Sequence, residues 1–573
     1  MTSVSLTRAH RTSRNEKDRE MLKKSVYTFL YTALVCNAAL AQHNYSIPAG
    51  NWTYSAIQEL QTRGYLLDLS PGFKPYRRME VAEALDHLRN ETGHKILPAV
   101  DRWLIDKLDH EFAYEMKLLR AKRARPDTAL TGARISEEDY LNFVNGYYGP
   151  FKYADKPEFR PILTIGFGFD VGNHLALYTD ATVNQTLRDD SIYTGSTKFG
   201  IDALAQQAYI QYSNRYFDLM FGRDYLSWGF GDNGETLVST TPGPLDMVSL
   251  FIKTDLVKFN WFVAQLNPMP EFTPDTNSYM PFPTAGVPDP SANRYFTGSR
   301  AEFNVLNKFF LGIYQAAIFG GPNASINLIS TNPMRVNFES TVNDHLESTT
   351  NNFLGADLSV FWPKDINLYG DLMIDDWQVD RKSKGDLKPD LYAIQAGMRA
   401  ADILFSTFGI SGTDLSLQYM MAGNRVYNEY NWASFLKLLS YNYPIASPFG
   451  DDFWNVELKL SQWISSDWKV GIEGMHIKHG STNIASPYTM PWLTDPNITV
   501  QTGYREPFPY GVIQETSLFS LDAMYQPVNN VYVGVSLIYS HERNANYDPG
   551  LVKNQISFIL TFYYRFSNSF LFN

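Results

Sequence analysis

The most constraining feature of the sequence is an alternation of apolar with polar or small side chains, which recurs from about residue 131 to the C-terminus. Within the segment 162–170, one face carries four apolar residues, Leu163, Ile165, Phe167 and Phe169. A period of two residues is that of a β-strand with one apolar face. In a secreted sandwich that face would form the core, whereas in a transmembrane barrel it would face lipid. The alternation therefore predicts an all-β fold and leaves these two architectures open.

The lengths of the connections separate the two architectures. Short connections such as 363–365 and 526–530 alternate with long ones such as 267–298 and 478–513. Short turns at one end and long loops at the other are typical of a bacterial outer-membrane barrel, and closure leaves no strand edge exposed to lipid. The strands are predicted at 139–148, 160–170, 174–184, 205–214, 216–225, 247–254, 257–266, 299–306, 309–319, 353–362, 366–375, 390–400, 413–422, 453–463, 467–477, 514–525, 531–540 and 555–566.

We therefore predict an all-β transmembrane antiparallel barrel of about eighteen strands over residues 131–573. The even count places both ends of the barrel segment at the short-turn end. The first strand and the connection 401–412 are the weakest assignments, so sixteen strands remain an alternative. Aromatic residues make up 15% of the chain and charged residues only 19%, a balance that suits a sheet with one apolar face.

The N-terminus has the features of a secretory signal peptide, which we predict over residues 1–41. Two lysines follow Met21, an alternative start, and the apolar run 26–36 precedes the small-residue site Ala39-Leu40-Ala41. A membrane anchor is the alternative interpretation, but the apolar run is short for a helix that spans a bilayer. The single cysteine, Cys36, lies inside this peptide, so the mature chain would hold neither a disulfide nor a cysteine-based zinc site.

Residues 42–130 have a helical period instead. Apolar residues recur every three or four positions, as in the set Leu104, Leu108, Phe112, Met116 and Leu119, which we assign to one long helix. We predict a small helical domain in the periplasm that caps the barrel. The alternative is a glycan-binding module, because Trp52–Gly64 and the segment 75–82 resemble half of a surface-layer-homology unit.

Charge and motif content exclude several functions. The chain has 49 basic and 60 acidic residues, a net charge of −11, which disfavours nucleic-acid binding because that needs a basic face. The sequence has no Gly-x-Ser-x-Gly elbow and no His-Glu-x-x-His motif. We therefore predict no enzyme activity, no catalytic residues, no cofactor and no metal site.

The segment 222–239 is the densest in chemically versatile side chains, and it leaves a strand for a long external loop. Its carboxylates and amide could hydrogen-bond sugar hydroxyls, and its aromatic rings could stack on pyranose faces. The candidate residues are Tyr225, Trp228, Asp232, Asn233 and Glu235. The alternative is that the loop folds inward and packs on its own aromatic residues as a plug. Trp492 and Tyr504, in the loop 478–513, form a second candidate patch.

The chain resembles the capsule-assembly Wzi family in its order of signal peptide, helical segment and large barrel. The residues that carry the resemblance are Gly222-Arg223-Asp224, Trp228-Gly229, Ser239 and Pro242-Gly243-Pro244. The resemblance implies an outer-membrane, lectin-like protein that binds or organises capsular or other surface polysaccharide. Outer-membrane lipid is the other expected partner, and protein partners in the envelope stay open. A diffusion porin, with sugars as one class of solute, is the main alternative, and a membrane-embedded enzyme is a remote one.

Overall fold

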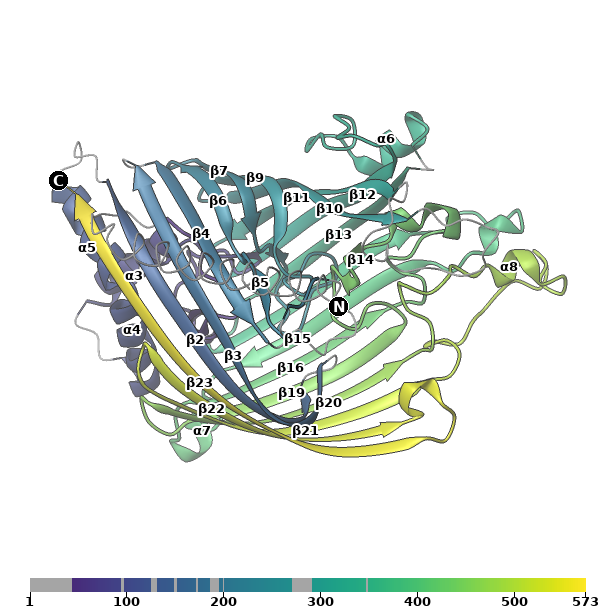
Figure 1. Ribbon diagram of the computed structural model, residues 1–573. Coiled ribbons are helices and arrows are strands. Elements are labelled where there is room, and N and C mark those ends of the chain that lie inside the picture. Colours follow the sequence, from purple (N-terminus) through teal and green to yellow (C-terminus); the bar gives the residue numbers. More distant parts are fainter. Residues whose placement is uncertain are drawn as a thin grey trace, which may run out of the picture.

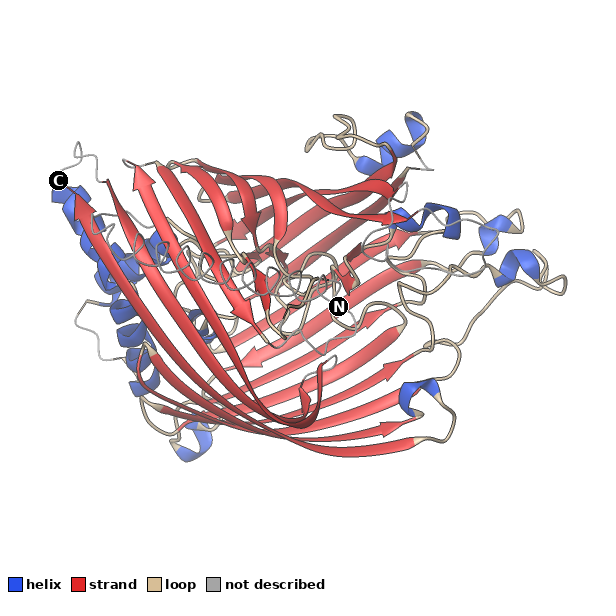
Figure 2. Ribbon diagram, in the orientation of Figure 1, coloured by secondary structure: helices blue, strands red, loops and turns tan. Residues whose placement is uncertain are grey.

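The computed structural model describes most of the chain that follows residue 43. The predicted signal peptide lies outside the described residues. The described ranges are 44–93, 97–124, 131–148, 152–171, 174–185, 195–198, 200–270, 291–346 and 349–572. They contain a group of N-terminal helices and a large closed β-barrel (Figures 1 and 2).

Four helices come first among the described residues: α2 (Trp52–Thr62), α3 (Arg78–Thr92), α4 (Ala99–Glu111) and α5 (Ala113–Ala124). The side chain of Asn51 caps α2 by accepting a hydrogen bond from the Thr53 amide at 3.1 Å. The helices share one apolar core, which includes Ile57, Leu85 and Leu104. None of the described helices is long and apolar enough to cross a membrane.

The barrel contains the predicted eighteen antiparallel strands within the described residues. The strands β5 and β6 both pair with β4 and make up one interrupted strand, and pairing of β2 with β23 closes the barrel. The strands are β2 (Thr131–Tyr148), β3 (Lys152–Val171), β4 (Leu175–Asn184), β5 (Asp202–Leu204), β6 (Ala208–Ser213), β7 (Phe217–Asp224), β9 (Leu245–Lys253), β10 (Val257–Pro270), β11 (Ser291–Val305), β12 (Phe309–Pro322), β13 (Thr350–Val360), β14 (Ile366–Asp376), β15 (Leu391–Ala400), β16 (Thr413–Ala422), β19 (Phe453–Trp463), β20 (Trp468–His479), β21 (Gln514–Val528), β22 (Val531–Arg543) and β23 (Val552–Phe572).

Short elements lie in the connections. They are β1 (Phe73–Lys74), β8 (Ser227–Trp228), α6 (Asn337–Asn343), η2 (Gly385–Leu387), α7 (Phe405–Phe408), η3 (Asn431–Leu436), β17 (Leu439–Ser440), β18 (Tyr443–Pro444), α8 (Pro491–Thr494) and η4 (Ala545–Tyr547).

Several boundaries differ from the predictions, among them those of β3, which begins at Lys152 rather than at 160, and β11, which begins at Ser291 rather than at 299. The first strand begins at Thr131 rather than at 139, and the last one continues to Phe572 rather than ending at 566, because the two pair with each other along this length. The predicted long helix over 104–119 is divided into α4 and α5, since Phe112 leaves the helical conformation at φ −101° and ψ 16°.

The two faces of the barrel wall differ in polarity. On β23 the outward positions carry Ile556, Phe562 and Phe566, which are exposed, whereas inward-facing Ser557 and Arg565 are buried. An exposed apolar surface that encircles a closed barrel is energetically stable only in contact with lipid. The barrel is therefore a membrane-spanning one.

The helices lie at the short-turn end of the barrel, opposite the long loops that carry α6 and α8 (Figure 1). Lys107 of α4 donates from Nζ to the carbonyl of Gln526 at 3.1 Å, close to the turn between β21 and β22. Arg78 of α3 joins α4 and α5 through Glu111 and Glu115, at 2.9 and 2.6 Å, and Glu111 also pairs with Arg565 of β23. The helical segment is thus bonded to the barrel wall.

Candidate functional site

The segment 225–244, between β7 and β9, folds into the lumen. Its strand β8 pairs with β1, so that Trp228 lies opposite Phe73, and the Gly229 amide donates to the carbonyl of Gly72 at 3.1 Å. We call residues 225–244 the inward segment. It joins the helical part of the chain to the barrel interior. This inward fold is the one that the plug alternative, left open by the sequence, describes.

Trp228 is buried in this segment, with only 2% of its surface exposed. Its indole nitrogen donates to Asn260 Oδ1 of β10 at 3.0 Å. Its ring packs edge to face against Phe262, with 5.2 Å between the ring centroids. The expectation of a flat platform that stacks on a sugar does not fit this position, because the ring belongs to the apolar core of the lumen.

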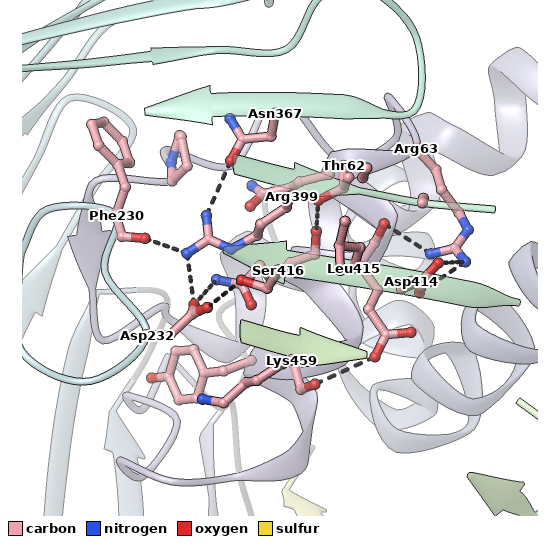
Figure 3. A pocket seen from close by; sticks show the side chains of 18 of the residues that line it. Thr62, Arg63, Phe230, Asp232, Asn367, Arg399, Asp414, Leu415, Ser416 and Lys459 are labelled. Atoms are coloured by element: carbon pink, nitrogen blue, oxygen red, sulfur yellow. Dashed lines mark hydrogen bonds and ion pairs between the residues drawn. The ribbon is translucent and has the colours of Figure 1, made fainter. Parts of the chain in front are cut away.

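Asp232 binds the barrel wall rather than solvent (Figure 3). Arg399 of β15 donates from Nη2 to Asp232 Oδ1 at 2.6 Å, and the same guanidinium donates to the Phe230 carbonyl and to Asn367 Oδ1. Ser416 of β16 donates to Asp232 Oδ2 at 3.0 Å. Burial by itself would raise the pKa of Asp232, but Arg399 and Lys459 hold it well below its usual range.

This anchor lines a cavity of about 420 Å³ between α2 and the wall, part of which is drawn in Figure 3. On the side of α2, the Gln58 amide donates to Asp232 Oδ1 at 3.0 Å. Arg63, which follows α2, pairs with Asp414 of β16 at 2.7 Å. The charges of Asp232, Arg399 and Arg63 are therefore committed to internal pairs, which ties both the inward segment and α2 to the wall.

Asn233 and Glu235 also form hydrogen bonds with partners inside the barrel. Asn233 donates from Nδ2 to Glu457 of β19 at 2.6 Å, and Glu235 accepts a hydrogen bond from the Gly231 amide at 3.0 Å. Glycine is required at 229, because its φ is +130° and a Cβ there would lie 2.3 Å from Glu235 Oε2. Burial raises the pKa of Glu235 to about 7, although Lys74 partly opposes the shift.

A second long loop, 423–452, closes over the inward segment. The Ser239 amide donates to the carbonyl of Ile445 at 3.1 Å, and the Tyr427 hydroxyl donates to the carbonyl of Thr236. Both loops contribute buried apolar side chains to one core, in which Leu237 and Val238 of the inward segment meet Leu438 and Leu439. The lumen beside β7 to β19 is thus filled by two interlocked loops.

Tyr225 lies at the start of the inward segment and is partly exposed. Its hydroxyl donates to Gln206 Oε1. It lines a cavity of about 640 Å³ between the N-terminal end of α2 and the wall on the side of β2, β3 and β4. The structure therefore separates Tyr225 from the other four candidates of this segment, which face the filled side of the lumen.

The second predicted patch lies at the long-loop end. Trp492 of α8 is buried, whereas Tyr504 is partly exposed, and their ring centroids are 5.7 Å apart. Arg425, from the loop 423–452, places its guanidinium 5.2 Å from the centroid of the Trp492 ring. Arg425 Nη1 donates to both carboxylate oxygens of Glu506 at 2.8 Å, and Glu506 accepts the Tyr504 hydroxyl at 2.8 Å.

We call this group the loop cluster. It consists of Arg425, Tyr488, Trp492, Tyr504, Glu506 and Tyr510. Sequence reasoning found only Trp492 and Tyr504. It missed Arg425 because that residue belongs to another loop, and no local spacing links the two. The conformation of Arg425, with φ at +72°, shows that its backbone is held in a strained state that sequence does not reveal.

Across the described part of the chain, no three His, Cys, Asp or Glu side chains form a group that could hold a metal ion.

The fold and the filled lumen define a class, a large outer-membrane β-barrel whose interior is occupied by its own loops. Residues 159–556 match the family model described as capsule assembly protein Wzi, and the chain belongs to this family. The predicted resemblance is therefore confirmed.

Solved structures are similar to this chain. One is the Escherichia coli protein Wzi, described as an outer-membrane protein involved in group 1 capsule assembly and as a carbohydrate-binding β-barrel. It is 14% identical, covers 91% of this chain and 99% of its own, and has a TM-score of 0.55. Another is Pseudomonas aeruginosa OccD3, at 10% identity, with 77% of this chain and 91% of its own covered and a TM-score of 0.41. Among curated protein sequences, none matches this chain.

Proposed function

We propose that this chain binds capsular or another surface polysaccharide at the long-loop end and thereby takes part in capsule assembly, without catalysing a reaction. Membership of the capsule-assembly Wzi family supports the proposal, as does the carbohydrate binding of the Escherichia coli protein. The observation that carries it is the loop cluster, which joins two long loops through the Arg425–Glu506 ion pair beside the tilted aromatic rings of Trp492 and Tyr504.

The loop cluster suits a glycan because it is rigid and amphipathic. Tyr504 offers an aromatic face at the surface, and its hydroxyl is held in place by Glu506. Thr489 beside it is exposed and accepts a hydrogen bond from Arg425 at 3.2 Å. Each contact with a sugar is weak, but a repeating polymer engages many copies of the protein, and multivalency multiplies the affinity.

The inward segment has a different role in this proposal. Trp228, Asp232, Asn233 and Glu235 hold the lumen closed, and Tyr225 faces the neighbouring cavity. The polysaccharide contacts are therefore assigned to Tyr504 and its surroundings, with Trp492 as the buried support of the Tyr504 ring.

The same reasoning gives the orientation of the protein in the outer membrane. We place the helical domain, residues 42–130, in the periplasm and the long loops outside, after removal of the signal peptide 1–41. Membrane lipid surrounds the barrel domain, 131–573. Both loops of the loop cluster then face the surface where a capsule is assembled.

The test is the affinity of the purified protein for capsular polysaccharide from the host strain. Tyr504→Ala should weaken binding about fivefold, because an aromatic contact is worth about 1 kcal/mol. Tyr504→Phe keeps the ring and should bind nearly as well as the parent. Tyr441→Ala is the matched control, since Tyr441 is exposed on the loop 423–452 but lies outside the loop cluster. Equal binding by the Tyr504→Ala variant and the parent would remove the loop cluster from the site.

A further inference from the structure

The connection between β12 and β13 lies against the outside of the barrel. On β10, Asn260 and Phe262 contact Trp228 in the lumen, so Trp261 faces outward. The Trp261 indole donates to the carbonyl of Thr331 at 2.9 Å. We call residues 323–346 the outer flap; it contains α6, which is drawn at the upper edge of Figure 1.

Two further outward-facing side chains hold the outer flap on the wall. Gln315 of β12 donates to the carbonyl of Arg335 at 2.8 Å and accepts from the Asn337 amide at 2.9 Å. Asn352 of β13 donates to the Thr341 hydroxyl of α6 at 2.8 Å. The outer flap therefore reaches across the outer face of the wall from β10 to β13.

The wall beneath the outer flap is polar where the rest of this face is apolar. In the strand register, Trp261 pairs with Ser299, and Ser299 pairs with Gln315. Two residues nearer the long-loop end, Thr297 pairs with Ala317, and Ala317 pairs with Asn352. Ser299, Thr297 and Asn352 are buried although they point away from the lumen. Acyl chains cannot hydrogen-bond such groups, so the outer flap occupies the place of lipid here.

The height of the bare wall supports the same conclusion. On β23, outward apolar residues run from Ile556 to Phe566, which spans about 33 Å along the strand and, with a tilt of about 40°, a belt about 25 Å tall. On β12 the bare apolar run extends only from Phe309 to Ile313, about 13 Å along the strand. On this side of the barrel, the rest of the apolar belt must come from the surface of the outer flap.

That surface is apolar and uncovered. The exposed fractions are 57% for Ile326, 83% for Leu328, 84% for Met334 and 53% for Val336. Charged Arg335 is neutralised within the outer flap by Glu339 and Asp344, at 2.9 and 2.8 Å. An apolar patch of this kind marks an interaction surface rather than a water-exposed loop.

We propose that the outer flap is a lipid-contacting element, seated in the outer leaflet, that completes the apolar belt over β10 to β13. Its exposed side chains continue the lipid-facing surface of Leu311 and Ile313, and its backbone and hydroxyl groups satisfy the polar wall behind it. A second copy of the chain or a partner protein on this face is the competing outcome.

The experiment uses the full mature protein in phosphatidylcholine vesicles with brominated acyl chains. Leu328→Cys and, separately, Met334→Cys carry an NBD label; the only cysteine of the sequence, Cys36, is replaced by Ser wherever the signal peptide is retained. Leu311→Cys, in the bare apolar wall, is the control for lipid contact, and Lys382→Cys, in the loop before η2, is the control for water.

Bromolipid quenching at 328 and 334 should reach at least half of that at 311 and exceed that at 382 several-fold. Quenching at both positions no greater than at 382 would overturn the proposal. Energy transfer between labelled copies without bromolipid quenching would also overturn it and would assign the face to a second copy.

Discussion

At the scale of single residues, the inward segment contains a carboxyl group whose pKa is raised by its surroundings. Glu235 is 2% exposed, and burial raises its pKa to about 7, above the ordinary value of 4.5. Because the folded state then holds a proton that the unfolded state releases, the contribution of Glu235 to the free energy of unfolding is highest below pH 4.5. It falls as the pH rises from 4.5 to about 7 and stays low above that value.

Glu235→Gln should remove this dependence, because an amide of the same size still accepts the Gly231 hydrogen bond and does not ionise. Between pH 5 and pH 8 the variant should lose less stability than the parent, by on the order of 2 kcal/mol. Thermal unfolding in detergent at the two pH values measures the difference. Glu339→Gln, at an exposed position, should leave the parent profile unchanged, and a Glu235→Gln profile parallel to the parent would disprove the assignment.

The candidate residues illustrate how far a local sequence can be interpreted. The composition of 222–239 identified a segment with an important role, and the plug alternative was correct for its fold. The fate of each side chain depended on partners far away in the sequence, such as Arg399 for Asp232 and Asn260 for Trp228. A tryptophan in a loop has the same appearance in sequence whether its ring is exposed or buried.

At the scale of elements, α2 depends on a buried guanidinium. The Arg63 side chain is fully buried and pairs with Asp414 of β16 at 2.7 Å and with Asp101 of α4 at 3.1 Å. Breaking a buried pair leaves uncompensated charge, which costs about 3 to 5 kcal/mol. Arg63→Met should therefore loosen the helices while the barrel strands stay formed.

Limited proteolysis of the protein in detergent measures this effect. Cleavage within the helices should become at least tenfold faster in Arg63→Met, with the barrel fragment still resistant. Arg89→Met is the matched control, because Arg89 makes a more exposed pair with Asp106 of α4. Equal cleavage rates for Arg63→Met and the control would show that the buried pair does not hold the helices.

The strands were predictable because two independent patterns agreed, the two-residue period and the alternation of short with long connections. The ends of β2 and β23 were missed for a physical reason. Polar residues such as Glu137 and Asn568 interrupt the outward, apolar face there, yet the backbones of β2 and β23 pair at these positions across the closing seam. The outer flap could not be foreseen, because nothing local distinguishes a loop that folds back on the wall from one that extends into water.

At the scale of the whole molecule, the barrel is large enough to conduct, but its own chain occupies it. The inward segment and the loop 423–452 share one apolar core inside the lumen, and the helices are bonded to the wall at the short-turn end. A barrel filled in this way should not pass ions steadily. The main alternative to polysaccharide binding, a diffusion porin, predicts the opposite.

Conductance in a planar bilayer distinguishes the two. With insertion verified independently, the parent protein should be silent. Replacement of residues 230–237 by a Gly-Ser linker removes the side chains of Asp232 and Glu235, together with the apolar side chain of Leu237 in the lumen core, and should produce steady channels. A linker of the same length in place of 380–387, in a loop outside the lumen core, should leave the barrel silent. Steady channels in the parent would mean that the lumen stays wet past both loops, and the porin alternative would then replace capsule binding as the better account of the barrel.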